Sequence, residues 1–239
     1  MYITPETVDD YIKLLRDKTY FTQANYGDGE MSCIIGEPGK NAQGEDYIRP
    51  LQQDLIRTIK EPRFTWFGFN PGKKIQGKVF NWFAYTFPEN RFPFTFKPVW
   101  KEILVEANVK GNFGGFIKAV RERKVIYVGP KHLIGIKPIV NYVDFIEVPL
   151  PNAYLAVNNT VNKVKEAVAK HNPDIILWSS GMATNVAMWR LIPSFPKLSM
   201  LDCGALFDPY VGVTSRGAYR KPEHKIAIER TLKEAGLWI

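Results

Sequence analysis

The sequence predicts an α/β fold: a mostly parallel β-sheet with helices on both faces and a basic, aromatic insertion. In the second half of the chain, short apolar segments alternate with segments whose apolar residues recur at helical spacing, a pattern typical of parallel sheets covered by helices. Four apolar segments run into small or polar residues, in the stretches VGPKH, VPLPNAY, SSGMA and DCGALFD. The 239 residues suit a single domain over 1–239, with the insertion at about 64–100.

The first half of the chain is expected to open with a helix over residues 4–18. Thr4 is a cap residue, Pro5 suits the first helical position, and acidic residues occupy the first turn before apolar residues at helical spacing. The other elements expected in this half are strands or extended segments at 20–26 and 31–36 around a GDGE turn, a helix at 46–60 and a strand at 63–69.

The second half has a regular rhythm of strand and helix. The expected strands are residues 123–130, 143–151, 173–181 and 197–204, and the expected helices are 157–171, 182–192 and 221–236. Ligands of open parallel sheets bind outside the carboxyl ends of the strands. We therefore expect the strand ends, together with Asp28, to line one cleft.

Residues 64–100 interrupt this rhythm. The segment holds 13 aromatic residues among 37, and its prolines disfavour long regular elements. Five basic residues against Glu89 give it a charge of +4: Lys73, Lys74, Lys78, Arg91 and Lys97. One interpretation is a satellite hydrophobic cluster with solvated lysines, since aromatic side chains mostly pack. The other is a lid that stacks on an acceptor and binds its phosphates.

The formal charge of +8 is concentrated in one part of the chain. Between Arg57 and Lys124 there are 14 Lys/Arg and 5 Asp/Glu, a difference of +9, so the rest of the chain sums to −1. A local basic field favours an anionic partner such as a nucleotide, a nucleic acid or an acidic membrane surface. A lysine face that only serves solubility has the same composition.

Composition also bears on location and metal class. No apolar run reaches the roughly 18 residues of a membrane span, and the acidic start does not resemble a secretory signal, so a cytoplasmic protein is expected. Cys33 and Cys203 lie in apolar surroundings, which predicts buried free thiols. The two cysteines and three histidines are not at zinc-ligand spacing, so no zinc site is expected.

The stretch YGDGE contains two carboxylates, Asp28 and Glu30. In an extended segment, residues two apart point to the same side, so the pair could converge on one cation. Two carboxylates are a typical protein share for Mg²⁺ or Mn²⁺, and Gly27 and Gly29 would let a bulky ligand approach the backbone. A GDG sequence is also common in hairpin turns, so spacing alone leaves both interpretations open.

A wider set of motifs resembles one known family. YGDGE, IIGE and PLQQDLIRTI, followed by KVIYVGPKHL, FIEVPLPNAY, DIILWSSGMATNVAMWRL and LSMLDCGALFDPY, occur in the order seen in the GT-D type glycosyltransferases, formerly a domain of unknown function. The resemblance implies a Rossmann-like fold and transfer of a sugar from a nucleoside-diphosphate sugar. It also implies that Asp28 and Glu30 hold a divalent metal at the diphosphate. Ala205 and Leu206 stand where family members often carry a histidine, so a role for that histidine does not transfer.

Further candidates for donor binding lie mainly at the strand ends. Lys131 and His132 could add positive charge, and Ser179, Ser180 and Gly181 between a strand and a helix suit a phosphate or a ribose. A surface Lys-His pair and a tight turn with a serine cap are the structural alternatives. The other candidates are Gly129, Asn152 and Tyr154 at strand ends and Arg216 as a phosphate clamp, against simple turn roles for Asn152 and Arg216.

Transfer without a covalent intermediate requires a base for the acceptor hydroxyl. Asp202 and Asp208, near the end of the last expected strand, are the candidates, although Asp202 also suits a structural turn. The leading hypothesis is a metal-dependent glycosyltransferase, with inverting and retaining chemistry both compatible. Its acceptor would be a nucleic acid, such as a hydroxylated DNA base, or a glycan or glycoprotein. The alternative is a non-catalytic nucleic-acid-binding module that uses the basic insertion.

Overall fold

The computed structural model describes residues 4–41, 44–70, 72–87, 97–100 and 102–237. Its centre is a seven-stranded sheet in the order β3-β2-β1-β7-β6-β4-β5, and every neighbouring pair is parallel. The predicted parallel α/β fold is therefore confirmed. The strands are β1 (Thr22–Tyr26), β2 (Trp66–Phe69), β3 (Lys97–Trp100), β4 (Val125–Gly129), β5 (Asp144–Glu147), β6 (Ile175–Trp178) and β7 (Ser199–Asp202).

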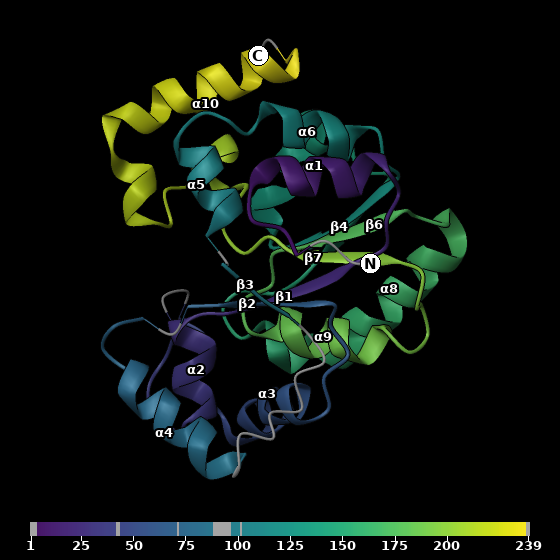
Figure 1. The fold of residues 1–239 in the computed structure, drawn as a ribbon. Helices are drawn as coiled ribbons and strands as arrows, with labels where there is room; N and C mark the ends of the chain where they lie inside the picture. The colour runs from purple at the N-terminus through teal and green to yellow at the C-terminus, as the bar shows by residue number, and fades with distance from the viewer. Residues whose placement is uncertain (1–3, 42–43, 71, 88–96, 101, 238–239) are drawn as a thin grey trace.

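Helices cover both faces of the sheet (Figure 1). One face carries α1 (Val8–Arg16), α5 (Ile103–Val109), α6 (Gly114–Arg121), α7 (Lys137–Val140) and α10 (Pro222–Ala235). The other face carries α2 (Asp28–Ile34), α3 (Arg49–Lys60), α4 (Gln76–Thr86), α8 (Val157–His171) and α9 (Ala183–Leu191). Short 3₁₀ helices follow several strands: η2 (Lys131–Ile136), η3 (Ala153–Ala156), η4 (Asp208–Val211) and η5 (Gly217–Arg220).

The central strands are apolar without alternation because both of their faces are buried. In β4, Val125 and Tyr127 pack among the side chains of the α1 face, whereas Ile126 and Val128 pack on the α2 face. All four are fully buried. Such continuous apolar runs are characteristic of parallel sheets between two helical layers, and this is why the sequence located β4, β6 and β7 well.

The predicted extended segment at 31–36 is wrong, because the chain forms α2 directly after β1. Gly27 is the N-cap of α2, and its backbone N–H donates to Glu30 Oε2 at 2.7 Å. Acidic side chains in the first turn also favour a helix through the partial positive charge at its N-terminus. GDGE is therefore a cap followed by a helical first turn, not a hairpin turn.

The segment at 64–100 differs from the expected insertion beside the sheet. Its two ends form β2 and β3, which extend the sheet outward from β1. Trp66 and Phe67 are core residues, whereas Phe80 and Tyr85 on α4 are 54% and 89% exposed. The packed interpretation is confirmed for the core positions, and stacking on an acceptor stays a prediction for the exposed ones. Arg91 and Glu89 lie outside the described residues.

A topological switch point lies between β1 and β7. The chain leaving β1 forms α2 on one face of the sheet, while the chain leaving β7 continues to η4 and α10 on the other. Divergent connections from neighbouring parallel strands open a crevice at their carboxyl ends. The sequence placed the binding edge at these ends but did not indicate which pair of strands would form the crevice.

Two further features concern the chain as a whole. Both Cys33 and Cys203 are buried free thiols, as predicted, and burial raises the pKa of Cys33 to about 12. Within the described part of the chain, no helix is long and apolar enough to cross a membrane.

Candidate functional site

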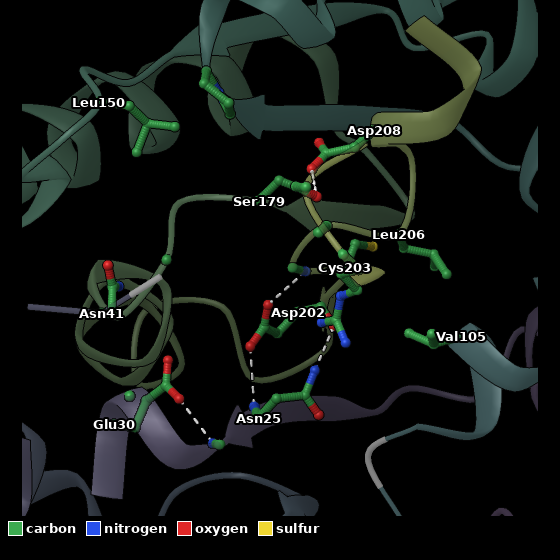
Figure 2. A pocket seen from close by; sticks show the side chains of 18 of the residues that line it. Asn25, Glu30, Asn41, Val105, Leu150, Ser179, Asp202, Cys203, Leu206 and Asp208 are labelled. Carbon is green, nitrogen blue, oxygen red and sulfur yellow. Dashed lines mark hydrogen bonds between the residues drawn. The ribbon is translucent and has the colours of Figure 1, made fainter. Parts of the chain in front are cut away.

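A cleft of about 450 Å³ opens at the carboxyl ends of the strands, over the switch point. Its walls come from the end of β1 and the start of α2, the segments after β4, β6 and β7, and α5 (Figure 2). The predicted residues that line it are Gly27, Asp28, Gly29, Glu30, His132, Ser179, Gly181, Asp202, Asp208 and Arg216. The predicted residues outside its lining are Gly129, Lys131, Asn152, Tyr154 and Ser180.

Three of the residues outside the lining have structural partners that explain their positions. Asn152 Oδ1 accepts the Asp46 backbone N–H at 2.8 Å, and Tyr154 N–H donates to Glu45 Oε1 at 3.4 Å. Ser180 Oγ lies 2.8 Å from Thr184 Oγ1 in the interior. These contacts tie the strand ends to neighbouring loops.

Asp28 and Glu30 occupy the first turn of α2. The expected convergence of residues two apart in an extended segment does not apply, because positions two apart on a helix differ by about 200°. Both nevertheless line the cleft, since the start of α2 faces it. The Asp28 side chain is exposed and makes no hydrogen bond or ion pair with any residue that the structure describes. Glu30 Oε2 accepts the Gly27 backbone N–H, and Oε1 has no hydrogen bond to any described residue (Figure 2).

The two carboxylates suit a hard divalent cation whose remaining coordination positions are filled by water and by a bound phosphate group. Across the described ranges, no group of three His, Cys, Asp or Glu side chains could hold a metal. Mg²⁺ is commonly held by one or two carboxylates, with water and substrate phosphate oxygens completing the shell. Asp28 and the Oε1 atom of Glu30 could supply these two carboxylate ligands.

Asp202 joins the ends of the two strands that border the cleft. The β1–β7 ladder is limited to the pairs Thr22–Met200 and Gln23–Leu201. Beyond it, Asp202 Oδ2 accepts the Asn25 backbone N–H at 3.1 Å and Oδ1 accepts that of Gly204 at 2.9 Å (Figure 2). The Asn25 side chain donates to the Asp202 carbonyl at 2.8 Å. These bonds hold the ends of β1 and β7 together beyond the last pair of the ladder.

Asp208 and His132 contact each other in the wall of the cleft. His132 Nε2 lies 3.2 Å from Asp208 Oδ1, and Ser215 Oγ donates to Asp208 Oδ2. Asp208 is buried, whereas the His132 side chain is 37% exposed. All three residues line the cleft.

Arg216 brings a cation to the end of β7. Its Nη1 donates to Glu102 Oε2 at 3.0 Å, and the pair is partly buried. A Cβ at Gly204 would lie 3.6 Å from Arg216 Nη2, so the guanidinium sits beside the turn that follows β7. A guanidinium has five N–H donors in a planar fork that matches phosphate oxygens.

Glu45, a buried acid next to the cleft, was not among the residues predicted for the site. Its Oε2 accepts the Met182 backbone N–H at 3.1 Å and the Asn41 side-chain amide at 3.2 Å. Burial raises the pKa of Glu45 to about 7. Gly181 has φ +58°, and a Cβ there would lie 2.9 Å from Glu45 Oε2, so this carboxylate fills the space that the glycine leaves. The partners lie up to 137 residues away, and no local motif marks them.

Glu45 predicts a pH dependence of stability. In the folded chain the Glu45 carboxyl has a pKa of about 7, whereas the ordinary pKa of an exposed glutamate is 4.5. The folded state therefore binds more protons in this interval, so the free energy of unfolding should fall, by about 1–3 kcal/mol, as pH rises through it. Urea unfolding at a series of pH values tests this. Glu45→Gln should flatten the slope, the exposed control Glu61→Gln should not, and equal slopes in all three proteins would contradict the assignment.

Comparison with known proteins bears on the fold. No family model and no curated protein matches the chain. A solved structure of a glycosyltransferase (DUF1792) from Streptococcus sanguinis matches with a TM-score of 0.59 and 17% identity, covering 87% of this chain and 84% of that one. Two further structures of domain of unknown function 1792 match with TM-scores of 0.62 and 0.58, each at 14% identity and 94% coverage of both chains. The last is described as having a distinct glycosyltransferase fold.

These matches confirm the resemblance that the sequence motifs indicated. The chain has the fold of the DUF1792 structures over nearly its whole length. Because fewer than one residue in five is identical, the residues of the cleft have to be judged by their own geometry.

Proposed function

We propose that the protein is a glycosyltransferase that moves a sugar from a nucleoside-diphosphate sugar to an acceptor hydroxyl. The observation that supports it most is the composition of the cleft at the switch point, where two carboxylates, Asp28 and Glu30, share one cavity with Arg216. Hard anionic oxygens for a cation and a guanidinium for phosphate oxygens are what a metal-bound diphosphate requires. The fold, shared with structures described as glycosyltransferases, agrees with this assignment.

Each residue then has a defined task. Asp28 and Glu30 would hold Mg²⁺ or Mn²⁺, which when bound neutralises charge on the departing nucleoside diphosphate. Arg216 donates hydrogen bonds to the diphosphate oxygens. Ser179 and Gly181 line the part of the cleft that would take the nucleoside or the sugar, and a glycine is needed there because the Glu45 carboxylate occupies the space of a side chain.

A thermal-shift panel of nucleoside-diphosphate sugars tests the donor class. We expect at least one of them to raise the Tm with Mn²⁺ or Mg²⁺ present and much less with a chelator, because a ligand that binds only the folded state stabilises it. Nucleoside monophosphates, which lack both the diphosphate and the sugar to be transferred, serve as the control. If no nucleoside-diphosphate sugar shifts the Tm in the presence of metal, the proposal fails.

The acceptor is proposed to be anionic, and nucleic acid is the class to test first. Lys73 and Lys74, just before α4, are exposed, as are Lys78, Phe80 and Tyr85 on α4. This surface adjoins the cleft, since a Cβ at Gly72 would lie 3.3 Å from Asp28 Cβ. Lys78 also contacts Glu37, with Nζ 2.6 Å from Oε1, whereas Lys73 and Lys74 have no ion pair with any residue that the structure describes.

The salt dependence of nucleic-acid affinity tests whether this surface binds an anionic acceptor. Each phosphate contact releases counterions, so affinity for single- or double-stranded nucleic acid should fall as salt rises. Replacing Lys73, Lys74 and Lys78 with Ala should flatten the salt slope and leave donor binding intact. The matched control replaces three exposed lysines on α8: Lys163, Lys165 and Lys170.

Two outcomes separate the rival functions. No nucleic-acid binding at low salt would favour a neutral glycan or glycoprotein acceptor. Nucleic-acid binding without any metal-dependent donor binding would favour the non-catalytic binding module.

A further inference from the structure

We propose that His132 is the catalytic base that takes the proton of the acceptor hydroxyl, with Asp208 as its positioning residue. The inference rests on the proposed sugar transfer and assigns a step within the same cleft. His132 belongs to η2 after β4, and Asp208 begins η4 after β7, so the pairing of two separate strand ends brings them together. Their contact, Nε2 to Oδ1, measures 3.2 Å.

Asp208 is placed to orient the imidazole and not to take the proton itself. It is only 7% exposed, and both of its oxygens are engaged, one with His132 and the other with Ser215 Oγ. A buried carboxylate that accepts the N–H of a histidine fixes the tautomer of the ring and stabilises the imidazolium when it forms. This is the part that Asp208 can play without breaking its present bonds.

His132 has the complementary properties. When Nε2 carries the hydrogen and donates it to Asp208, the lone pair of the neutral ring is on Nδ1. Nδ1 has no hydrogen-bond partner among the residues that the structure describes. The side chain is 37% exposed and lines the cleft, so an acceptor hydroxyl can reach it.

The other acids of the cleft are already engaged in other contacts. Both oxygens of Asp202 accept backbone N–H groups, and Glu102 pairs with Arg216. Asp28 and Glu30 belong to the donor side of the proposed site. His132 therefore remains the lining residue, among those described, whose geometry suits proton transfer from an acceptor.

The step balances as a single displacement. The acceptor oxygen forms a bond to the anomeric carbon of the donor sugar while the bond from that carbon to the diphosphate oxygen breaks. The electron pair of that bond leaves with the nucleoside diphosphate, and the hydroxyl proton moves to His132 Nδ1. One displacement inverts the configuration of the anomeric carbon, so the product should have the opposite anomeric configuration to the donor.

Donor hydrolysis tests the role of His132 without knowledge of the natural acceptor, because water takes the place of the hydroxyl. The probes are UDP- and GDP-hexoses with Mn²⁺, and the readout is released nucleoside diphosphate. General base catalysis contributes about 10²–10⁴-fold, so His132→Gln should lower kcat by at least about 100-fold while the donor KM changes little. Asp208→Asn should lower kcat in the same direction, and the double variant should lose little more than His132→Gln alone.

The chain offers a matched control in His171, whose Nε2 lies 3.1 Å from Asp144 Oδ2 at the opposite end of the sheet. His171→Gln removes the same kind of pair outside the cleft and should leave kcat unchanged. Nitrogen-15 NMR of the imidazole rings supplies a readout that needs no turnover. His132 should carry its proton on Nε2 in the unaltered chain, and Asp208→Asn should change that population.

The outcomes separate this inference from the proposed function. Full kcat in His132→Gln with donor binding intact, or a ring protonated on Nδ1 in the unaltered chain, would overturn the role of His132 alone. No donor binding and no hydrolysis by the unaltered chain would overturn the proposed function and this inference with it.

Discussion

Replacing Asp28 with Asn is expected to abolish sugar transfer and to weaken donor binding in Mn²⁺. The amide keeps the size of the side chain but removes the negative charge, so a divalent cation loses one of the two carboxylates that the protein offers. Mutation of groups that merely support a metal ligand typically costs 10–100-fold in metal affinity or activity. Loss of a ligand itself should therefore cost at least about 100-fold, measured as metal-dependent donor hydrolysis and as the donor Kd.

The folding of this variant should change little, because the Asp28 side chain is exposed and has no hydrogen bond or ion pair with another described residue. Loss of its charge from the first turn of α2 should cost about 0.3–1 kcal/mol. Asp9→Asn, on the first turn of α1 and outside the cleft, is the matched control and should behave as the unaltered chain. Full metal-dependent hydrolysis by Asp28→Asn would show that this carboxylate holds no metal.

Replacing Arg216 with Ala should weaken binding of the nucleoside-diphosphate sugar. Hydrogen bonds to charged groups contribute about 1.5–3 kcal/mol, so the donor Kd should rise by about 10- to 100-fold. Arg216→Lys should recover only part of the loss, because an ammonium keeps the charge but not the planar fork of donors. Isothermal titration of the donor in the presence of Mn²⁺ measures both.

Arg220 provides the control for this experiment. It is exposed in the same region of the chain, outside the cleft lining, and Arg220→Ala removes the same charge. If Arg216→Ala and Arg220→Ala changed the Kd equally, the effect would come from the general basic field and not from a contact with the diphosphate.

The sequence predicted the layers of the fold better than their local boundaries. β4, β6 and β7 are apolar runs because they are buried on both faces, and a run of this kind is visible without any tertiary information. The first turn of α2 was missed for a local reason. A glycine N-cap with a reciprocal glutamate has nearly the same letters as a hairpin turn, and the choice between them depends on the packing of Met31 and Ile34 against the sheet.

The sequence predicted which strand-end residues line the cleft in most cases, but it did not predict which of them contact each other. Asp208 and His132 were each singled out, but their pairing spans 76 residues and depends on the order of the strands. Asn25 and Glu45 escaped notice because their side chains bond to the Asp202 carbonyl and the Met182 backbone N–H, which lie 177 and 137 residues away. Such contacts follow from the placement of β7 beside β1, which no periodicity or composition encodes.

That placement has a consequence for how the protein is made. β7 is formed by residues 199–202, yet among the described strands it alone joins the group β1, β2 and β3 to the group β4, β5 and β6. On a ribosome, both groups emerge before the strand that bridges them. Contacts between such distant segments are slow to form. A nascent chain that ends before residue 199 lacks the strand that joins the two groups, and it also lacks Asp202, Asp208 and Arg216 from the lining of the cleft. The cleft is therefore expected to be completed late in synthesis.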